Sequence, residues 1–263
     1  MRTGNRPGGV TGSTAAAGAT VLLLTATHFA AHLDRALPAV VAPALKTHFE
    51  LTDAQLGLLL GPAFGVAFFL GNLLVGRWAD RAHRYRLLAW SLLLWSAACI
   101  GFASATAWEQ LIGARLVLGL GQAALAPAAL SLRLRGAPGE RSGRTVATFT
   151  SGAPLGRGAA LLLGGGLLTA IAAFASVSET GVAPWRLLFV IMTAPNLLLA
   201  ALLLRQAEPV RAPGPARRRR EAAAWARAEA PALAAQLVAG SAAVLLDNRW
   251  APGLPACSTA RRD

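Results

Sequence analysis

Long apolar runs alternate with short polar segments along most of the chain. Each run is long enough to cross about 30 Å of hydrocarbon at about 1.5 Å per residue of helix. The runs therefore predict an all-α integral membrane protein built as a six-transmembrane-helix bundle. The six predicted helices lie at roughly residues 16–44, 54–78, 87–105, 108–132, 145–174 and 185–204.

The segments outside residues 16–204 differ from the bundle in composition. Residues 1–15 lack periodicity and predict a disordered cytoplasmic tail. Residues 205–230, rich in Pro, Ala and Arg, predict a cytoplasmic linker. In residues 231–263, the apolar part 231–246 is shorter than the roughly 20 residues that a span requires, so we interpret it as a partial seventh helix before an irregular C-terminus.

The composition supports the membrane class. The chain has 263 residues, of which 55% are hydrophobic and 14% charged, and a mean hydropathy of +0.50, a balance not shown by water-soluble domains. Its formal charge of +13 raises the question of nucleic acid. The arginines, however, lie in short clusters between apolar runs and are not interleaved with aromatic residues. We therefore expect no nucleic-acid partner.

Basic residues occupy alternate loops, as expected for residues retained on the cytoplasmic side. Clusters lie at the N-terminus and after the second, fourth and sixth helices, whereas the opposite loops contain only Lys46 and Arg186. This distribution predicts that both ends of the bundle face the cytoplasm, in the inner (plasma) membrane of the cell. The block Arg217 to Arg220 is interpreted as an orientation signal, with contact to anionic membrane lipids as the alternative.

Four ionisable groups fall inside the predicted spans: Asp34, Arg35, Arg115 and Arg157. A charge at the centre of a membrane helix costs on the order of 3 kcal/mol, so such groups indicate a polar cavity. Measured from the outer ends of their helices, Asp34 lies at a depth of about 15 Å and Arg115 at about 10 Å. Arg157 lies about 12 Å from the outer surface. Three helices therefore place charge at a similar level.

This layer contains one carboxylate and three guanidiniums, and its excess positive charge predicts an anionic small-molecule substrate. The planar guanidinium suits carboxylate or phosphate because it donates two parallel hydrogen bonds. An alternative arrangement pairs Asp34 with Arg115 as a structural bridge, with Arg35 or Arg157 extending toward the surface. The sequence leaves both arrangements open.

Two histidines share a helix face with Arg35, because His28, His32 and Arg35 follow each other at intervals of four and three residues. Histidine moves protons near neutral pH, so His32 joins the candidate translocation site. A metal site needs more ligands than this face provides. No pairing of nucleophile and base and no phosphate-binding loop is present, so we expect no catalytic residue, no metal, no cofactor and no enzymatic activity.

Small residues recur at four-residue spacing in two of the predicted helices. In lipid, helices associate through close packing, and small residues allow their backbones to approach. Both series therefore predict packing stripes. The series are Gly57, Gly61 and Gly65 in the second helix, and Gly152, Gly156, Ala160 and Gly164 in the fifth.

Three motifs together resemble the major facilitator superfamily of secondary transporters, in particular its spinster-like and anion:cation-symporter-like members. The first is the loop after the second helix, with Gly76, Asp80, Arg81 and Arg84 in the expected order. The second is the stretch from Arg115 through Gly119, Gly121 and Gln122 to Ala123. The third is Asp34-Arg35 followed by residues 51–59, and the resemblance extends over about residues 20–246.

The resemblance implies a substrate site near the middle of the membrane, between two six-helix bundles that alternate access by rocking. It places the first and fourth helices at the cavity, in agreement with the charges of Asp34, Arg35 and Arg115. Gln122 stands where this subgroup commonly has Glu, which leaves Asp34 as the carboxylate of the membrane interior. In the family, the aspartate that corresponds to Asp80 helps to latch the first bundle to the second.

The chain length matches only the first of these two bundles. We expect a truncated N-terminal half of a transporter for a small organic anion, whose partner is the missing C-terminal half. One alternative is a half-transporter that pairs with a second copy of itself. Another is a membrane interaction protein that transports nothing, or an inert remnant.

Overall fold

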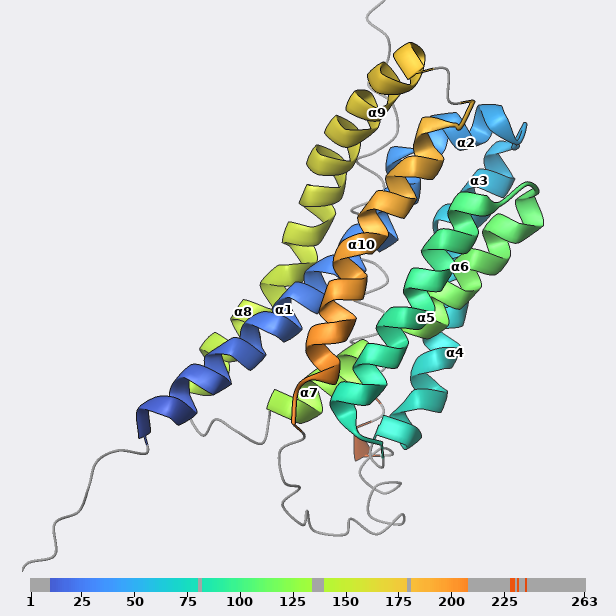
Figure 1. Cartoon of the computed structure of the whole chain (residues 1–263). Helices are drawn as coiled ribbons and strands as arrows, with labels where there is room; N and C mark the ends of the chain where they lie inside the picture. Colours follow the sequence, from blue (N-terminus) through green and yellow to red (C-terminus); the bar gives the residue numbers. More distant parts are fainter. Residues whose placement is uncertain are drawn as a thin grey trace, which may run out of the picture. The chain divides into compact units, whose positions relative to one another are not determined.

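In a computed structural model, the described residues are 10–79, 82–133, 140–178 and 181–207, with 228, 229, 231 and 235 (Figure 1). The chain divides into two units, residues 1–209 and 210–263. The second unit lies almost entirely outside the described residues, as do most of the predicted linker and the predicted partial seventh helix. The bundle within the first unit positions the candidate site.

The six predicted runs appear as helices, several of them divided into shorter pieces, and the described residues include no strand. The prediction of an all-α membrane bundle is confirmed. The helices are α1 (Val10–Val40), α2 (Ala42–His48), α3 (Asp53–Leu60), α4 (Pro62–Ala79), α5 (Arg84–Ser104), α6 (Trp108–Gln122), α7 (Leu125–Arg133), α8 (Glu140–Ala159), the π-helical turn η1 (Ala160–Gly164), α9 (Gly165–Ser178) and α10 (Pro184–Leu204).

Within the described residues, five segments are long and apolar enough to cross a membrane: Asp53–Val75, Arg84–Ser104, Trp108–Ala129, Gly143–Phe174 and Pro184–Leu204. α1 is not among them, and it contains Asp34, Arg35 and two histidines. It begins at Val10, inside the segment predicted as a disordered tail. Residues 1–9 lie outside the described part.

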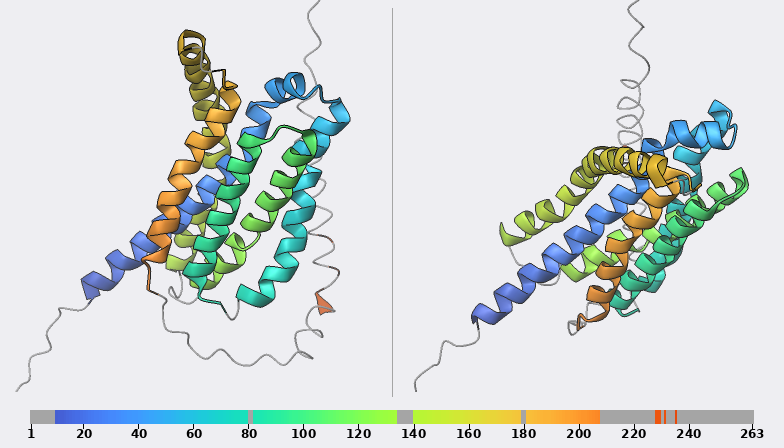
Figure 2. Two further views of the ribbon diagram at one scale, coloured as in Figure 1. Left: turned by 45° about the vertical axis from the view of Figure 1, so that its right-hand side comes forward. Right: turned by 45° about the horizontal axis from the view of Figure 1, so that its top comes forward.

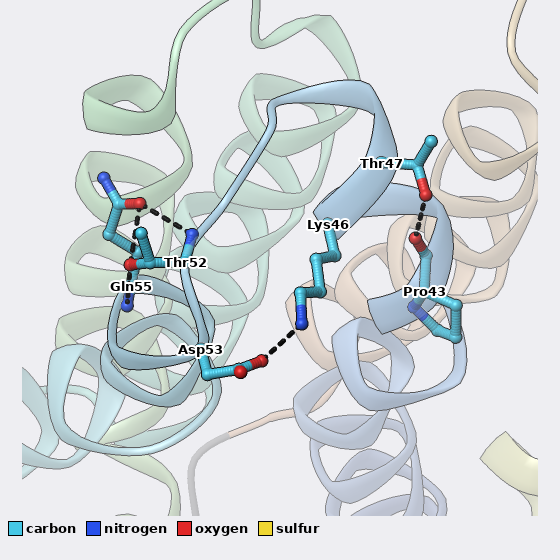
Figure 3. A network of polar contacts seen from close by, with 6 residues as sticks. All are labelled: Pro43, Lys46, Thr47, Thr52, Asp53 and Gln55. Atoms are coloured by element: carbon cyan, nitrogen blue, oxygen red, sulfur yellow. Dashed lines mark hydrogen bonds and ion pairs between the residues drawn. The ribbon is translucent and has the colours of Figure 1, made fainter.

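The second span is divided at Gly61, between α3 and α4. Pro62 begins α4 and has no backbone N–H to donate to the preceding turn, and Gly61 adopts φ −122° and ψ −81°. The start of α3 is fixed by a capping box in which the Thr52 hydroxyl accepts from the Gln55 N–H at 3.2 Å (Figure 3). Lys46 of α2 forms an ion pair with Asp53, which fastens the turn between α2 and α3 (Figure 3).

α1 packs along α8, and the small residues of the fifth span lie at this contact (Figure 2). A Cβ atom at Gly152 would lie 2.9 Å from the carbonyl oxygen of Thr25, and one at Gly156 would lie 2.3 Å from that of Phe29. No side chain fits between two backbones this close. The packing stripe predicted for the fifth helix is therefore confirmed.

The stripe predicted for the second helix is wrong within the described residues. A Cβ at Gly57 or Gly65 would meet nothing within 4 Å, and one at Gly61 would meet only its own helix. α6 instead supplies the glycines of close contact: Gly119 lies against the backbone of Phe64 in α4, and Gly121 against that of Trp95 in α5. The three helices α4, α6 and α5 lie side by side in that order (Figure 2).

Arg186 fastens α10 to the C-terminal end of α5. Its Nη1 and Nη2 atoms donate to the carbonyl oxygens of Ala103 and Ala105, both at 2.7 Å, and its guanidinium lies 4.6 Å from the Trp185 ring. Cations are favourable at helix C-termini because the last carbonyls lack partners within the helix. This role accounts for an arginine in a loop that is otherwise nearly free of basic residues.

Candidate functional site

Arg35 and Gln122 form the contact between α1 and α6 at the level of the predicted charged layer. The Gln122 Oε1 atom accepts from Arg35 Nη2 at 3.0 Å and from Arg35 Nε at 3.3 Å. The Gln122 Nε2 atom donates to the Ala31 carbonyl oxygen at 3.0 Å, so both ends of the amide are engaged with α1. Gln122 is buried and thereby holds the Arg35 guanidinium in one orientation.

Two phenylalanines of α4 lie against the same guanidinium. The Arg35 Cζ atom is 4.3 Å from the ring centroid of Phe64 and 4.9 Å from that of Phe68, and the two rings stack at 5.4 Å. Aromatic faces attract a cation most strongly when water is excluded. The sequence reasoning missed both residues, although two phenylalanines four residues apart on one face of an apolar span were an available signal.

Arg115 of α6 is buried and directed at backbone carbonyls. Its Nε atom donates to Leu59 at 3.0 Å and its Nη2 atom to Leu60 at 3.1 Å, at the break between α3 and α4. Its Nη1 atom donates to the Arg35 carbonyl oxygen at 3.4 Å. The end of α3 carries a partial negative charge, which compensates the buried cation. Arg115 therefore joins α1, the second span and α6.

Asp34 is buried between α1 and α10, where its Oδ2 atom accepts from Asn196 Nδ2 at 2.6 Å. Within the described residues Asp34 forms no ion pair with Arg115, so the alternative of a structural bridge between them is wrong. The reason is geometric: Asp34 and Arg35 are adjacent in α1 and therefore point to different neighbours. The sequence reasoning also missed Asn196, a polar residue inside an apolar span.

The two histidines connect α1 to α8. His28 Nδ1 lies 2.9 Å from the Phe149 carbonyl oxygen, and its ring stacks on that of Phe149 at 4.2 Å. His32 Nδ1 lies 3.0 Å from the His28 carbonyl oxygen. Since a carbonyl only accepts, Nδ1 of each ring is the donor, which leaves Nε2 of a neutral His32 as an acceptor.

Arg157 of α8 has an exposed side chain next to the tightly packed Gly156. Its charge acts on both Arg35 and His32, so the three groups lie within electrostatic range of one another. α1 and α8 together therefore present two guanidiniums with an imidazole beside them.

The predicted loop motif is only partly within the described residues. Gly76 lies in the last turns of α4, and Arg84 is the first residue of α5 and is buried. Asp80 and Arg81 lie outside the described part of the chain. No group of three or more His, Cys, Asp or Glu side chains within the described residues is arranged to hold a metal ion.

A bundle of membrane-length helices with guanidiniums in its interior is the construction expected of a membrane transport protein. The chain belongs to the Major Facilitator Superfamily, whose sequence profile matches residues 24–257. The predicted family is thus confirmed.

Two curated relatives illustrate the similarity. The chain is 32% identical over 173 residues to an MFS-type efflux pump of Mycolicibacterium smegmatis, with 66% of this chain and 38% of the relative covered. It is 31% identical over 184 residues to the 4-hydroxybenzoate transporter PcaK of Pseudomonas putida, with 70% and 38% covered. The chain therefore spans about two fifths of the length of these relatives. Their names support the prediction of a transport protein and not an enzyme.

A solved structure gives the same assignment. The bundle matches a bacterial homologue of the human lysosomal transporter Spinster, in an inward-facing and unoccupied conformation, with a TM-score of 0.66 and 30% identity. The match covers 74% of this chain and 44% of the homologue. The expected similarity to spinster-like members is confirmed.

Proposed function

We propose that this bundle forms the N-terminal, substrate-binding half of a secondary active transporter for a small organic anion. The proposal is based on the contacts that the Arg35 guanidinium makes and on the ion pair that it lacks. Its Nε and Nη2 atoms are engaged by Gln122, whereas no carboxylate within the described residues is ion-paired with it. A bound carboxylate on Nη1 supplies the missing negative charge. The name of PcaK, a transporter of the aromatic carboxylate 4-hydroxybenzoate, supports the same class of substrate.

The site residues take different roles in this proposal. Arg35 contacts the substrate, and Gln122 orients Arg35. Arg115 positions α1 and α6 through the backbone of the second span. His32 and Arg157 border the anion from α1 and α8, and Asp34 secures α10 to α1 through its bond with Asn196.

Alternating access needs a second bundle on the opposite side of the substrate. We propose that the C-terminal bundle of a complete transporter, or a second copy of this chain, takes that place. The segment from Gly76 to Arg84, with Asp80 and Arg81, then acts as the conformational loop on the cytoplasmic side. This orientation also places the N-terminus in the cytoplasm and the arginine clusters at the headgroups of the plasma membrane.

Arg35→Gln is expected to weaken the binding of 4-hydroxybenzoate about 30-fold, because a charge-assisted hydrogen bond in a site shielded from water is lost. The measurement is the increase in apparent Tm of the purified full chain in lipid nanodiscs as the ligand is titrated. Arg144→Gln removes an exposed arginine near the start of α8 and serves as the matched control.

The neutral analogue 4-hydroxybenzamide separates charge recognition from binding of the ring. The wild-type chain is expected to bind it at least ten times more weakly than the acid. Equal binding of acid and amide by the wild type, or unchanged binding of the acid by Arg35→Gln, contradicts the proposed anion site.

Measurements of uptake test whether transport requires a second bundle. Proteoliposomes that contain the purified chain alone are expected to take up labelled 4-hydroxybenzoate only if two copies complete the pathway. A cross-linked dimer and a co-reconstituted C-terminal bundle of a spinster-like relative provide the two comparisons. No uptake in any of the three preparations contradicts transport and favours a non-transporting interaction protein.

A further inference from the structure

Two of the three guanidiniums in the charged layer lack a compensating group. Arg115 is the exception, because its three donor nitrogens face carbonyl oxygens and the negative end of α3 lies beside it. For Arg35, the acceptor is the uncharged Gln122, and the side chain of Arg157 is exposed. Within the described residues neither Arg35 nor Arg157 is ion-paired with a carboxylate.

The nearest carboxylate in the sequence does not serve these two arginines. The Asp34 side chain points from α1 toward α10, where it is buried against Asn196. The charges acting on Arg35 are those of Arg115 and Arg157, both of the same sign. The pair Arg35 and Arg157 therefore carries two positive charges that the bundle itself leaves unbalanced.

The Arg35 guanidinium and the backbone that carries Arg157 are both held in place. Arg35 is held by Gln122 and the rings of Phe64 and Phe68. Arg157 follows Gly156, whose backbone lies directly against that of Phe29 in α1. A Cβ atom at Gly156 would lie 3.1 Å from the His32 Cβ atom, so His32 lies at the contact between α1 and α8, next to the position of Arg157. A substrate with one negative group neutralises one arginine and leaves the other uncompensated in the membrane interior.

We infer that the substrate is a small dianion, with one acidic group bound by Arg35 and the second by Arg157, and with the side chain of His32 beside them. This inference rests on the proposed function and names the substrate class of the same site. Each acidic group then receives donors from one guanidinium, and the charges of site and substrate balance.

Matched pairs of ligands test the number of charges at constant size. The probes are succinate and succinamate, adipate and adipamate, and terephthalate and terephthalamate, where each second member replaces one carboxylate by a neutral amide. Binding is measured through the ligand-dependent Tm of the full chain in nanodiscs. In at least one pair, the dianion is expected to bind ten times more tightly than the monoamide.

Two variants assign the acidic groups. Arg157→Gln is expected to weaken dianion binding about tenfold and to change monoamide binding less than threefold, whereas Arg35→Gln weakens both. Arg144→Gln, on the same helix α8, is the control and retains the wild-type preference. If every monoamide binds as tightly as its dianion, or if Arg157→Gln keeps the preference, the dianion inference is overturned while the anion site stands. If none of the six ligands binds while 4-hydroxybenzoate does, the dianion inference fails and the anion site stands; if 4-hydroxybenzoate does not bind either, the anion site fails as well.

Discussion

Gly156→Ala is expected to lower the stability of the bundle by about 3 kcal/mol, at the upper end of the range for overpacking. The added methyl group would lie 2.3 Å from the Phe29 carbonyl oxygen and 3.1 Å from the Cβ atom of His32. Neither the backbone nor a Cβ atom moves aside without separation of α1 from α8. The apparent Tm in nanodiscs should fall on the order of 10 °C.

Gly158→Ala is the matched control for this substitution. It adds the same methyl group two residues further along α8, where a Cβ meets nothing within 4 Å. Alanine has a higher helix propensity than glycine by about 1 kcal/mol, so the apparent Tm should remain the same or rise slightly. Similar losses at positions 156 and 158 would show that helix flexibility matters and that the close approach of α1 does not.

Arg115→Leu is expected to destabilise the bundle by about 3 kcal/mol, since it removes three charge-assisted hydrogen bonds and leaves the carbonyls of Leu59, which is buried, and Leu60 without this partner. The apparent Tm without ligand is the measurement. Arg115→Lys retains the charge, but a single ammonium group cannot reach all three carbonyls, so an intermediate loss is expected.

The same variant distinguishes a positioning role of Arg115 from direct substrate binding. If Arg115→Leu keeps the wild-type Tm but loses 4-hydroxybenzoate binding, Arg115 is a substrate ligand as the sequence suggested. A lower Tm in the absence of ligand, together with residual binding at low temperature, establishes the positioning role.

The helices were predictable from the sequence because their signal is local. Apolar runs of membrane length predicted six helical regions, five of which are long and apolar enough to cross a membrane within the described residues. Four-residue spacing revealed that Gly152 and Gly156 form a packing face. The same spacing in Gly57, Gly61 and Gly65 gave a wrong prediction. A stripe of small residues shows that a helix can be approached closely, but it does not show which neighbour approaches it.

The candidate site was predictable in depth but not in its partners. Helix rise alone places Arg35 and Arg115 at a similar level. The acceptors of Arg115 are backbone carbonyls, which every residue has, so the sequence does not indicate which residues provide them. Asp34 was expected near the arginines because of its charge, whereas its partner is Asn196, 162 residues later in the chain.

The π-helical turn η1 has a consequence for how this sequence is aligned with those of its relatives. A π-helical turn accommodates one residue more than an α-helical turn, and each residue rotates the helix by about 100°. Residues before Ala160 and after Gly164 therefore follow two different registers, one facing α1 and the other facing α10. In an alignment with a relative whose fifth span is α-helical throughout, a one-residue gap is needed at this turn, because without it every position of α9 is assigned to the wrong face.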